Sequence, residues 1–203
     1  MTLTRGLINR KFNPRVNGTV KALAFAPGGD HLYAGGDFTQ ANSRNRRYLV
    51  RLTAPGGRVS RKWTPNLRSV GACGFGCVQD LATTKKRVYA GVGGKRQDGN
   101  SIYSFGAGRG RRLWSQKGNG DFHSVAVRGG KVYAGGHFLQ VGPTERRRFA
   151  TFDAAQGGLR PYSPSFDKLV RTVNFAGRRL FVGGDFTHAS GASRDHLARF
   201  SPS

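Results

Sequence analysis

The stretch Leu32-Tyr33-Ala34-Gly35-Gly36-Asp37-Phe38 occurs in four related forms along this chain of 203 residues. The other copies are Val88-Tyr89-Ala90-Gly91, Val132-Tyr133-Ala134-Gly135-Gly136-His137-Phe138 and Leu180-Phe181-Val182-Gly183-Gly184-Asp185-Phe186. The aromatic residues at the second position lie 44 to 56 residues apart, a period typical of solenoids, propellers and repeat arrays. The sequence therefore predicts four similar structural units.

Each unit contains the pattern of several short β-strands. An apolar segment of strand length opens each unit, at 20–25, 77–82, 122–127 and 169–175. A glycine-rich turn joins it to the repeated phrase, which predicts a tight hairpin. A basic polar loop then leads to a third predicted strand, at 48–53, 102–105, 149–153 and 197–200. A fourth strand is predicted in the first three units, at 58–63, 111–115 and 159–162.

Four short antiparallel strands in each unit, without helical periodicity, are typical of propeller blades. We therefore expect an all-β fold, a β-propeller that forms a single domain over residues 1–203. Its four recognisable four-stranded blades are expected at about 15–66, 77–117, 121–163 and 169–203. The last unit lacks a fourth strand, and residues 6–14 repeat the glycine, aromatic and proline spacing of 57–65. The N-terminal segment is therefore predicted to close the last blade and its exposed edge.

The chain is strongly basic, with 34 Lys and Arg against 10 Asp and Glu and a formal net charge of +24. The positive electrostatic potential of such a chain favours acidic macromolecules as partners. In a propeller the loops after the second strands share one face, so their cations are predicted to bind an anion there. They are Arg44, Arg46, Arg47, Lys95, Arg96, Arg146, Arg147, Arg148 and Arg194. The alternative is that these cations form only a solvated basic surface. Cations also occur in the turns on the opposite face, which weakens the case for a single binding groove.

No stretch approaches the apolar run of about 20 residues that a spanning helix needs, so no membrane span is expected. The first ten residues lack the apolar region of a secretory signal. Either the protein stays inside the cell, or the chain is a mature or truncated form.

The two cysteines, Cys73 and Cys77, bracket a short glycine-rich segment. They are interpreted as a local disulfide or as two free thiols. Two thiolates without a second pair of ligands nearby cannot fill a tetrahedral metal site, so no metal is expected.

Asp37, His137 and Asp185 occupy one equivalent position after the Gly-Gly pair. They are interpreted mainly as repeated architecture, in which side chains cap turn amides, because structural positions repeat while active sites usually do not. The alternative is a ring of ligands at the mouth of the channel, to which His188 would belong.

The pattern Tyr-x-Gly-Gly-Asp-Phe-Thr, followed by Leu-Ala-Arg-Phe, resembles the bacterial delta-sixty type β-propeller repeats of actinobacterial surface and secreted proteins. In the second unit, Val88-Tyr89-Ala90-Gly91 and the segments 101–105 and 110–115 resemble quinoprotein-type repeats. The resemblance implies a repeat scaffold for binding that is secreted or displayed on the cell surface. No cofactor pocket carries over, so no cofactor is expected.

These observations favour a non-catalytic binding scaffold over an enzyme. Its partner would be an acidic macromolecule, namely a nucleic acid, an anionic glycopolymer or an acidic protein. One alternative is a carbohydrate-active propeller enzyme with its site at the channel mouth. Another is a structural fragment of a larger surface protein. Four blades could also be half of an eight-bladed ring, which leaves a homo-oligomer open.

Overall fold

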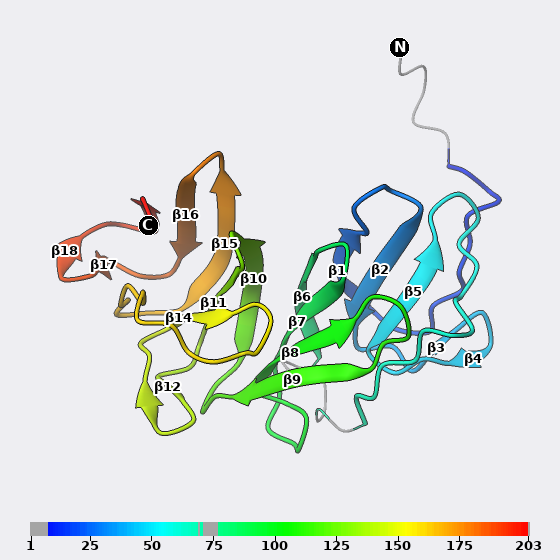
Figure 1. Cartoon of the computed structure of the whole chain (residues 1–203), viewed down its shortest axis with the longest axis horizontal. Coiled ribbons are helices and arrows are strands. Elements are labelled where there is room, and N and C mark those ends of the chain that lie inside the picture. The colour runs from blue at the N-terminus through cyan, green and yellow to red at the C-terminus, as the bar shows by residue number, and fades with distance from the viewer. Residues whose placement is uncertain (1–7, 69, 71–76, 203) are drawn as a thin grey trace, which may run out of the picture.

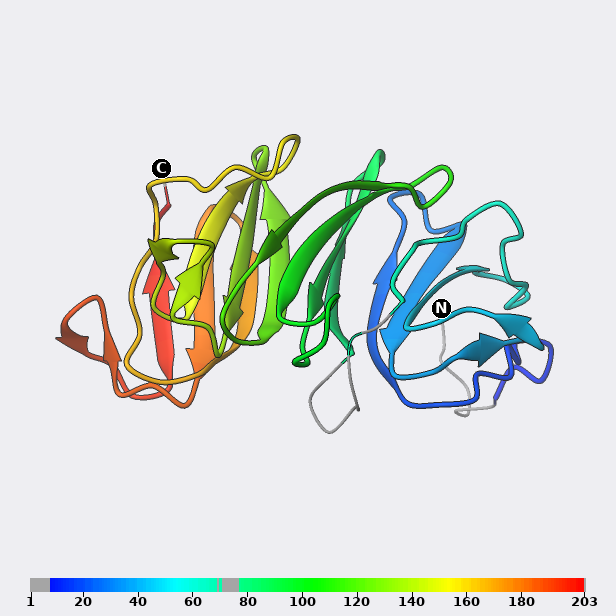
Figure 2. The same ribbon diagram turned by 90° about the horizontal axis from the view of Figure 1, so that it is seen from below.

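The computed structural model describes residues 8–68, 70 and 77–202, and its regular elements in this part of the chain are all β-strands. Four antiparallel sheets, here called blades one to four in chain order, lie side by side along an open arc (Figures 1 and 2). Blade one is β1 (Val20–Phe25), β2 (His31–Gly36) and β5 (Leu49–Thr53), and blade two is β6 (Val78–Thr83), β7 (Arg87–Val92), β8 (Ser101–Gly106) and β9 (Arg112–Lys117). Blade three is β10 (Phe122–Arg128), β11 (Lys131–Gly136) and β14 (Phe149–Asp153), and blade four is β15 (Val170–Ala176), β16 (Arg179–Gly184) and β19 (Leu197–Phe200). The predicted all-β propeller fold is confirmed.

A small hairpin follows the second strand in three of the blades. These hairpins are β3 (Gln40–Ala41) with β4 (Arg44–Asn45), β12 (Gln140–Val141) with β13 (Thr144–Glu145), and β17 (His188–Ala189) with β18 (Ala192–Ser193). Blade two has the loop 93–100 at this place. The basic polar loops of the sequence are therefore ordered projections from the blades.

The Gly-Gly pair of the repeated phrase ends the second strand, where backbone segments approach closely. A β-carbon on Gly36 would overlap the carbonyl oxygen of Thr19, and the same holds for Gly136 against Asp121 and Gly184 against Leu169. The first strand of every blade is bulged at this end, as the register shift between Val20 and Ala22 illustrates. In blades one, three and four only glycine fits this close approach beside the bulge, whereas blade two has Val92 at the equivalent position.

The core runs between the blades as well as within them. One apolar cluster joins Tyr33 and Leu49 of blade one to Val78 and Leu81 of blade two. Two further clusters continue the core from blade two into blade three and from blade three into blade four. Each blade is thus stabilised by burying apolar surface against its neighbours.

The predicted first and third strands agree with the structure to within one residue at each end. The fourth strand differs. It is complete only in blade two, as β9, while blades one and three keep the single bridges Leu52↔Val59 and Phe152↔Leu159. Trp63 explains the departure in blade one, because its buried indole turns toward blade two and donates to the Gly106 carbonyl at 3.0 Å.

The predicted closure by the N-terminal segment is wrong for the part of that segment that the structure describes. Residues 8–14 form no strand, and among the described residues β19 has no strand on its outer side. Phe12 instead packs against the apolar cluster of blade one, and the Pro14 carbonyl accepts the Asn42 amide at 2.8 Å. A bridge between Val16 and Ala41 holds this segment beside the small hairpin of blade one. The residues Gly118 and Phe166, which precede blades three and four, make the equivalent bridges to Val141 and Ala189.

Among the described residues, no helix is long and apolar enough to span a membrane.

Candidate anion-binding face and channel-facing residues

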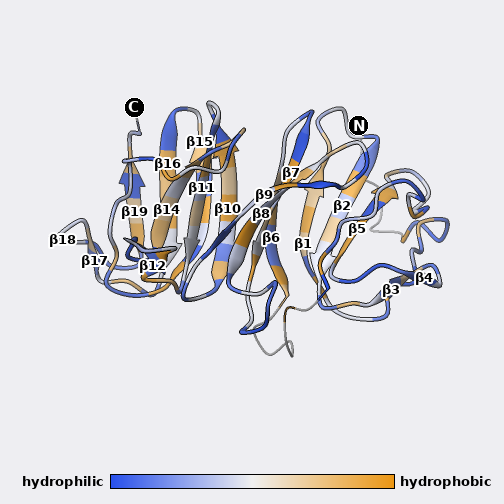
Figure 3. Cartoon of the chain, turned by 60° about the horizontal axis from the view of Figure 1, so that its bottom comes forward, coloured by the Kyte–Doolittle hydropathy of each residue, from blue (hydrophilic) through white to orange (hydrophobic). Residues whose placement is uncertain are grey.

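The nine cations predicted to bind an anion lie on the small hairpins, directly after them, or on the loop 93–100. The hairpins project along one side of the arc, where Figure 3 labels β3, β4, β12, β17 and β18. The loop 93–100 also joins a second strand to a third, so it emerges on the same side. We call this side the hairpin face.

Three arginines at equivalent positions brace the hairpins. Arg46, Arg146 and Arg194 each donate through Nη1 to the carbonyl of the preceding residue, at 2.7, 2.8 and 2.6 Å. Arg46 also donates to the Ser60 carbonyl at 3.0 Å, and both Arg46 and Arg146 are half-buried. These two side chains are therefore largely committed to the loop structure.

Arg148 is committed in the same way. Its Nη1 donates to the His137 carbonyl at 2.6 Å, and its backbone has φ +68°, a conformation shared by the equivalent residues Tyr48 and His196. Arg147 is exposed and forms an ion pair with Glu145, with 2.6 Å between Nε and Oε1. The predicted cations that remain exposed on the hairpin face are Arg44, Arg47, Lys95, Arg96, Arg147 and Arg194.

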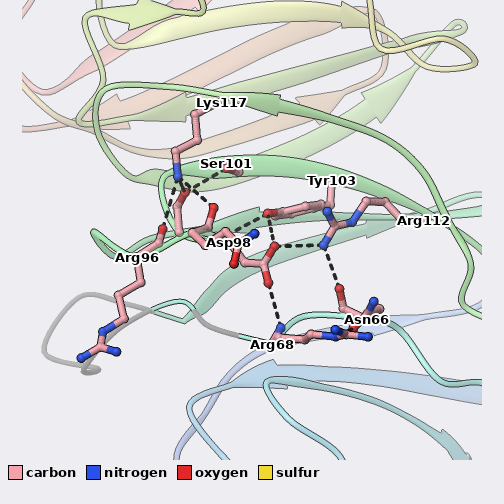
Figure 4. Close-up of polar contacts among 10 residues, drawn as sticks. Asn66, Arg68, Arg96, Asp98, Ser101, Tyr103, Arg112 and Lys117 are labelled. Atoms are coloured by element: carbon pink, nitrogen blue, oxygen red, sulfur yellow. Dashed lines mark hydrogen bonds and ion pairs between the residues drawn. The ribbon is translucent and has the colours of Figure 1, made fainter.

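A buried carboxylate holds the loop that carries Lys95 and Arg96. The Asp98 carboxylate accepts hydrogen bonds from the Arg68 backbone amide at 2.8 Å and from Arg112 at 3.0 Å (Figure 4). The Tyr103 hydroxyl donates to the Asp98 backbone carbonyl at 2.9 Å and lies 3.3 Å from the carboxylate. The Lys117 ammonium donates to the carbonyls of Arg96, Gln97 and Gly99, so this cation is also committed to structure. Burial raises the pKa of Tyr103 to about 12, so its hydroxyl stays protonated well above neutral pH.

Sequence reasoning missed this Asp98 network. Its only signal was an acidic residue in a basic, glycine-rich loop, and the partners Arg68, Tyr103 and Arg112 come from other segments. The network fixes Lys95 and Arg96 on the hairpin face.

A second polar set occupies the first strands of the four blades. Lys21, Gln79, His123 and Arg171 are the second residues of β1, β6, β10 and β15. Burial lowers the pKa of His123, the charges of Arg171 and Lys21 lower it further, and Asp121 opposes them. Charged side chains of blades one, three and four therefore share one electrostatic environment. Its sequence signal was a polar residue inside each apolar first strand, as in Val20-Lys21-Ala22-Leu23.

The four predicted channel-mouth residues make separate contacts. Asp37 accepts the Thr19 amide at 2.6 Å, and Asp185 binds Arg171 through both carboxylate oxygens, at 2.6 and 2.8 Å, which holds the pKa of Asp185 below its usual range. His137 is exposed on the loop that follows β11. His188 lies on β17, where its Nδ1 is 3.5 Å from Asp167.

Two concavities lie near these residues. One, of about 160 Å³, brings Arg147 and His188 together on the hairpin face, with Phe166 and Asp167 in its wall. The other, of about 400 Å³, follows β6, β10 and β15 and is lined by backbone and by the side chains of Asp80, Ser124, Thr172, Asn174 and their neighbours. Within the described residues, no group of three His, Cys, Asp or Glu side chains could hold a metal ion.

Cys77 is buried at the start of blade two. Cys73 lies outside the described residues, so the proposed disulfide stays a prediction.

Four antiparallel blades along an arc, with the first strands of neighbouring blades in contact, define a β-propeller repeat protein. Two segments of the sequence, residues 30–57 and 178–203, match the model of a β-propeller domain of unknown function, DUF5122. These segments are the second strand, small hairpin and third strand of blades one and four. No curated protein matches the sequence.

Solved structures with the same fold have little sequence in common with this chain. The computationally designed Ika4 protein is 13% identical with a TM-score of 0.63, and the match covers 96% of this chain and 99% of Ika4. The WD40 repeats of RRP9 are 13% identical with a TM-score of 0.61, covering 86% of this chain and 47% of RRP9. The Pan2 WD40 domain of Neurospora crassa is 11% identical with a TM-score of 0.58, covering 91% and 50%. The chain thus spans about half the length of the two WD40 chains.

Proposed function

We propose that this chain is a non-catalytic propeller scaffold that binds a polyanion through the hairpin face. The observation that carries the proposal is that every blade contributes at least one exposed cation to this face. Arg44 and Arg47 come from blade one, Lys95 and Arg96 from blade two, Arg147 from blade three and Arg194 from blade four. Cations spread over one face can follow the charges of an extended polyanion.

The acidic residues near these cations leave them available for a ligand. Asp98 is buried, and Glu145 and Asp195 are the exposed acids of the same segments. Among the six cations, and within the part of the chain that the structure describes, Arg147 alone has a carboxylate within ion-pair distance. Since that pair is exposed, it contributes about 1 kcal/mol or less and can exchange for a ligand anion.

The scaffold also presents the cations from ordered segments. Asp98 and Lys117 hold the loop of blade two, while Arg46 and Arg146 brace the hairpins of blades one and three. A ligand then binds without first ordering the loops, which lowers the entropic cost of association.

Contacts of this kind read backbone charge and shape rather than base sequence. A nucleic acid, an anionic glycopolymer and an acidic protein all supply such charge. The similarity of the repeats to delta-sixty and quinoprotein-type sequences supports a scaffold role and, for the delta-sixty type, a secreted or surface location. The alternative of a carbohydrate-active enzyme gains no support from the geometry, because His188 of β17 contacts Asp167 in the link before β15, whereas Asp185 is paired with Arg171 of β15.

Binding of heparin and of a DNA duplex, measured across a salt series, tests the proposal, with uncharged dextran as the control. If about six cations contact a duplex, affinity should fall by a factor on the order of 10³ between 50 and 200 mM salt. No binding at low salt, or an affinity that does not change with salt, would contradict it.

A further inference from the structure

Consecutive blades are joined by a repeated fit of apolar side chains onto glycine. The first glycine of the repeated phrase lies under residues from the first strand of the next blade. A β-carbon on Gly35 would overlap Val78, and one on Gly135 would overlap Val170. At Gly91 the neighbours are the Phe122 carbonyl oxygen and the Val125 side chain, 2.9 and 3.0 Å from the position of a β-carbon. We call the glycine the socket and the apolar first-strand residues the knobs.

Polar contacts accompany this fit at the bulge of the first strand. The Asp80 carboxylate of blade two accepts the Val125 amide of blade three at 2.8 Å and the Ser124 hydroxyl at 2.9 Å. Ser124 in turn accepts the Val173 amide of blade four at 3.0 Å. The residue at the bulge therefore ties its own blade to a knob of the next one.

Aromatic packing adds to the interface between blades three and four. The ring of Tyr133 in β11 meets the ring of Phe175 in β15 edge-on, with 4.9 Å between their centroids. The equivalent position to Tyr133 in blade four is Phe181, and the equivalent position to Phe175 in blade one is Phe25.

Blade four has a socket without a knob. A β-carbon on Gly183 would meet Thr172 and His196 of its own blade, and no side chain of another blade lies within 4 Å among the described residues. Leu197, opposite Gly183, is 63% exposed, whereas the equivalent Leu49 and Phe149 are fully buried. Thr172 is exposed at the bulge position that Ser124 occupies in blade three.

Blade one has knobs without a socket. Val20, Leu23 and Phe25 are 38%, 61% and 59% exposed. The equivalent residues Val78 and Leu81 of blade two are buried at 0% and 6% exposed. Exposed apolar residues gathered on one strand mark an interaction site.

We propose that the knobs of blade one dock on the socket of blade four in a second copy of this chain, continuing the interface that joins the blades within the chain. The two contacts are identical and head-to-tail, and together they close a two-fold ring of eight blades. Leu23 then lies over Gly183 of the other copy, Phe25 packs on Phe181, and the Thr172 hydroxyl accepts the Leu23 amide.

The occupant is a second copy because blades one and four stand at the two ends of an open arc (Figure 1), too far apart to meet within one chain. The four blades overlie about half of each longer WD40 chain, so two copies together reach about the length of those chains. The inference does not depend on polyanion binding.

Mass in solution, measured by light scattering after gel filtration, tests this docking. The chain should have twice its mass of 22.0 kDa. Leu23→Arg and, separately, Gly183→Val should each convert it to the single chain. Leu139→Arg changes a leucine that is 43% exposed on a different surface and should leave the mass doubled.

Chemical cross-linking tests the docking without relying on substitutions that could disturb folding. Phe25→Cys and Phe181→Cys proteins, mixed in equal amounts with a short bismaleimide, should form a covalent pair, while either protein alone should form far less. A single-chain mass with no cross-link would overturn the proposal. So would a cross-link within one Phe25→Cys, Phe181→Cys chain without a change in mass, or a mass that grows with concentration beyond two copies.

Discussion

The hydroxyl of Ser124 in β10 accepts the backbone amide of Val173 in β15 across the boundary between blades three and four, at 3.0 Å. The same hydroxyl donates to Asp80 of blade two, so one buried side chain links three blades. Ser124→Ala should lower the free energy of unfolding by about 1–3 kcal/mol, because it leaves a buried amide without its acceptor. Urea denaturation measures this change.

Ser193→Ala is the matched control for that substitution, since Ser193 is exposed on β18 and should change stability little. Equal effects of the two substitutions would show that the link between blades contributes nothing.

Gly135→Ala should destabilise the contact between blades three and four. Its added methyl group would overlap Val170 and crowd Val173, and overpacking of a buried site typically costs about 1–3 kcal/mol. Gly158→Ala places the same group in open space and should be nearly neutral. Thermal denaturation of both variants checks the difference, and a neutral Gly135→Ala would refute the interpretation of this glycine as a socket.

Asp98→Asn should loosen the loop that carries Lys95 and Arg96. The substitution removes the negative charge that Arg112 contacts in a buried site. Asn has one side-chain oxygen, whereas the carboxylate uses Oδ2 to accept from the Arg68 amide and Oδ1 to accept from Arg112. Faster hydrogen exchange in residues 93–100, with other blades unaffected, is the expected result. Unchanged exchange in this loop would show that the loop is held by other contacts.

The pH dependence of stability should carry a contribution from His123. Burial lowers its pKa from 6.5, so the unfolded chain binds a proton that the folded chain resists. Stability attributable to His123 is therefore complete at pH values above 6.5 and is lost as the pH falls below it. Urea denaturation between about pH 5 and 7 should show a weaker dependence in His123→Gln than in the original chain. The matched substitution His31→Gln, at the first residue of β2, should keep the dependence, and an unchanged slope in His123→Gln would contradict the assignment.

Much of the blade architecture could be predicted from the repeated phrase. The Gly-Gly pair marks a place where two backbone segments approach closely, so its position in the sequence locates the end of the second strand. The neighbouring strands can be placed from it, and the predicted third strand 149–153 has the observed bounds. The fourth strands were less predictable, because their fate depends on tertiary contacts. Trp63, for instance, leaves the sheet to fill a space against blade two. The role of residues 8–14 was missed for the same reason, since Phe12 finds its apolar partners in blade one.

The candidate site could likewise be predicted only in part. The period of the repeat predicts which loops share a face, and the cations lie there. The sequence could not separate the exposed Arg47 from its neighbour Arg46, whose guanidinium bonds to the Ser60 carbonyl. That distinction depends on the conformation of the hairpin. The Asp98 network likewise needs partners from distant segments.

The most direct test of polyanion binding compares two triple variants that remove the same charge. One carries Arg47→Ala, Arg96→Ala and Arg194→Ala on the hairpin face, and the other carries Lys85→Ala, Lys86→Ala and Arg178→Ala in exposed turns on the opposite side. For a DNA duplex, the slope of log affinity against log salt should decrease in magnitude by about three in the first variant and stay near the original in the second. Equal changes in both variants would show that the +24 charge acts as a diffuse field and would contradict a binding face made by the hairpins.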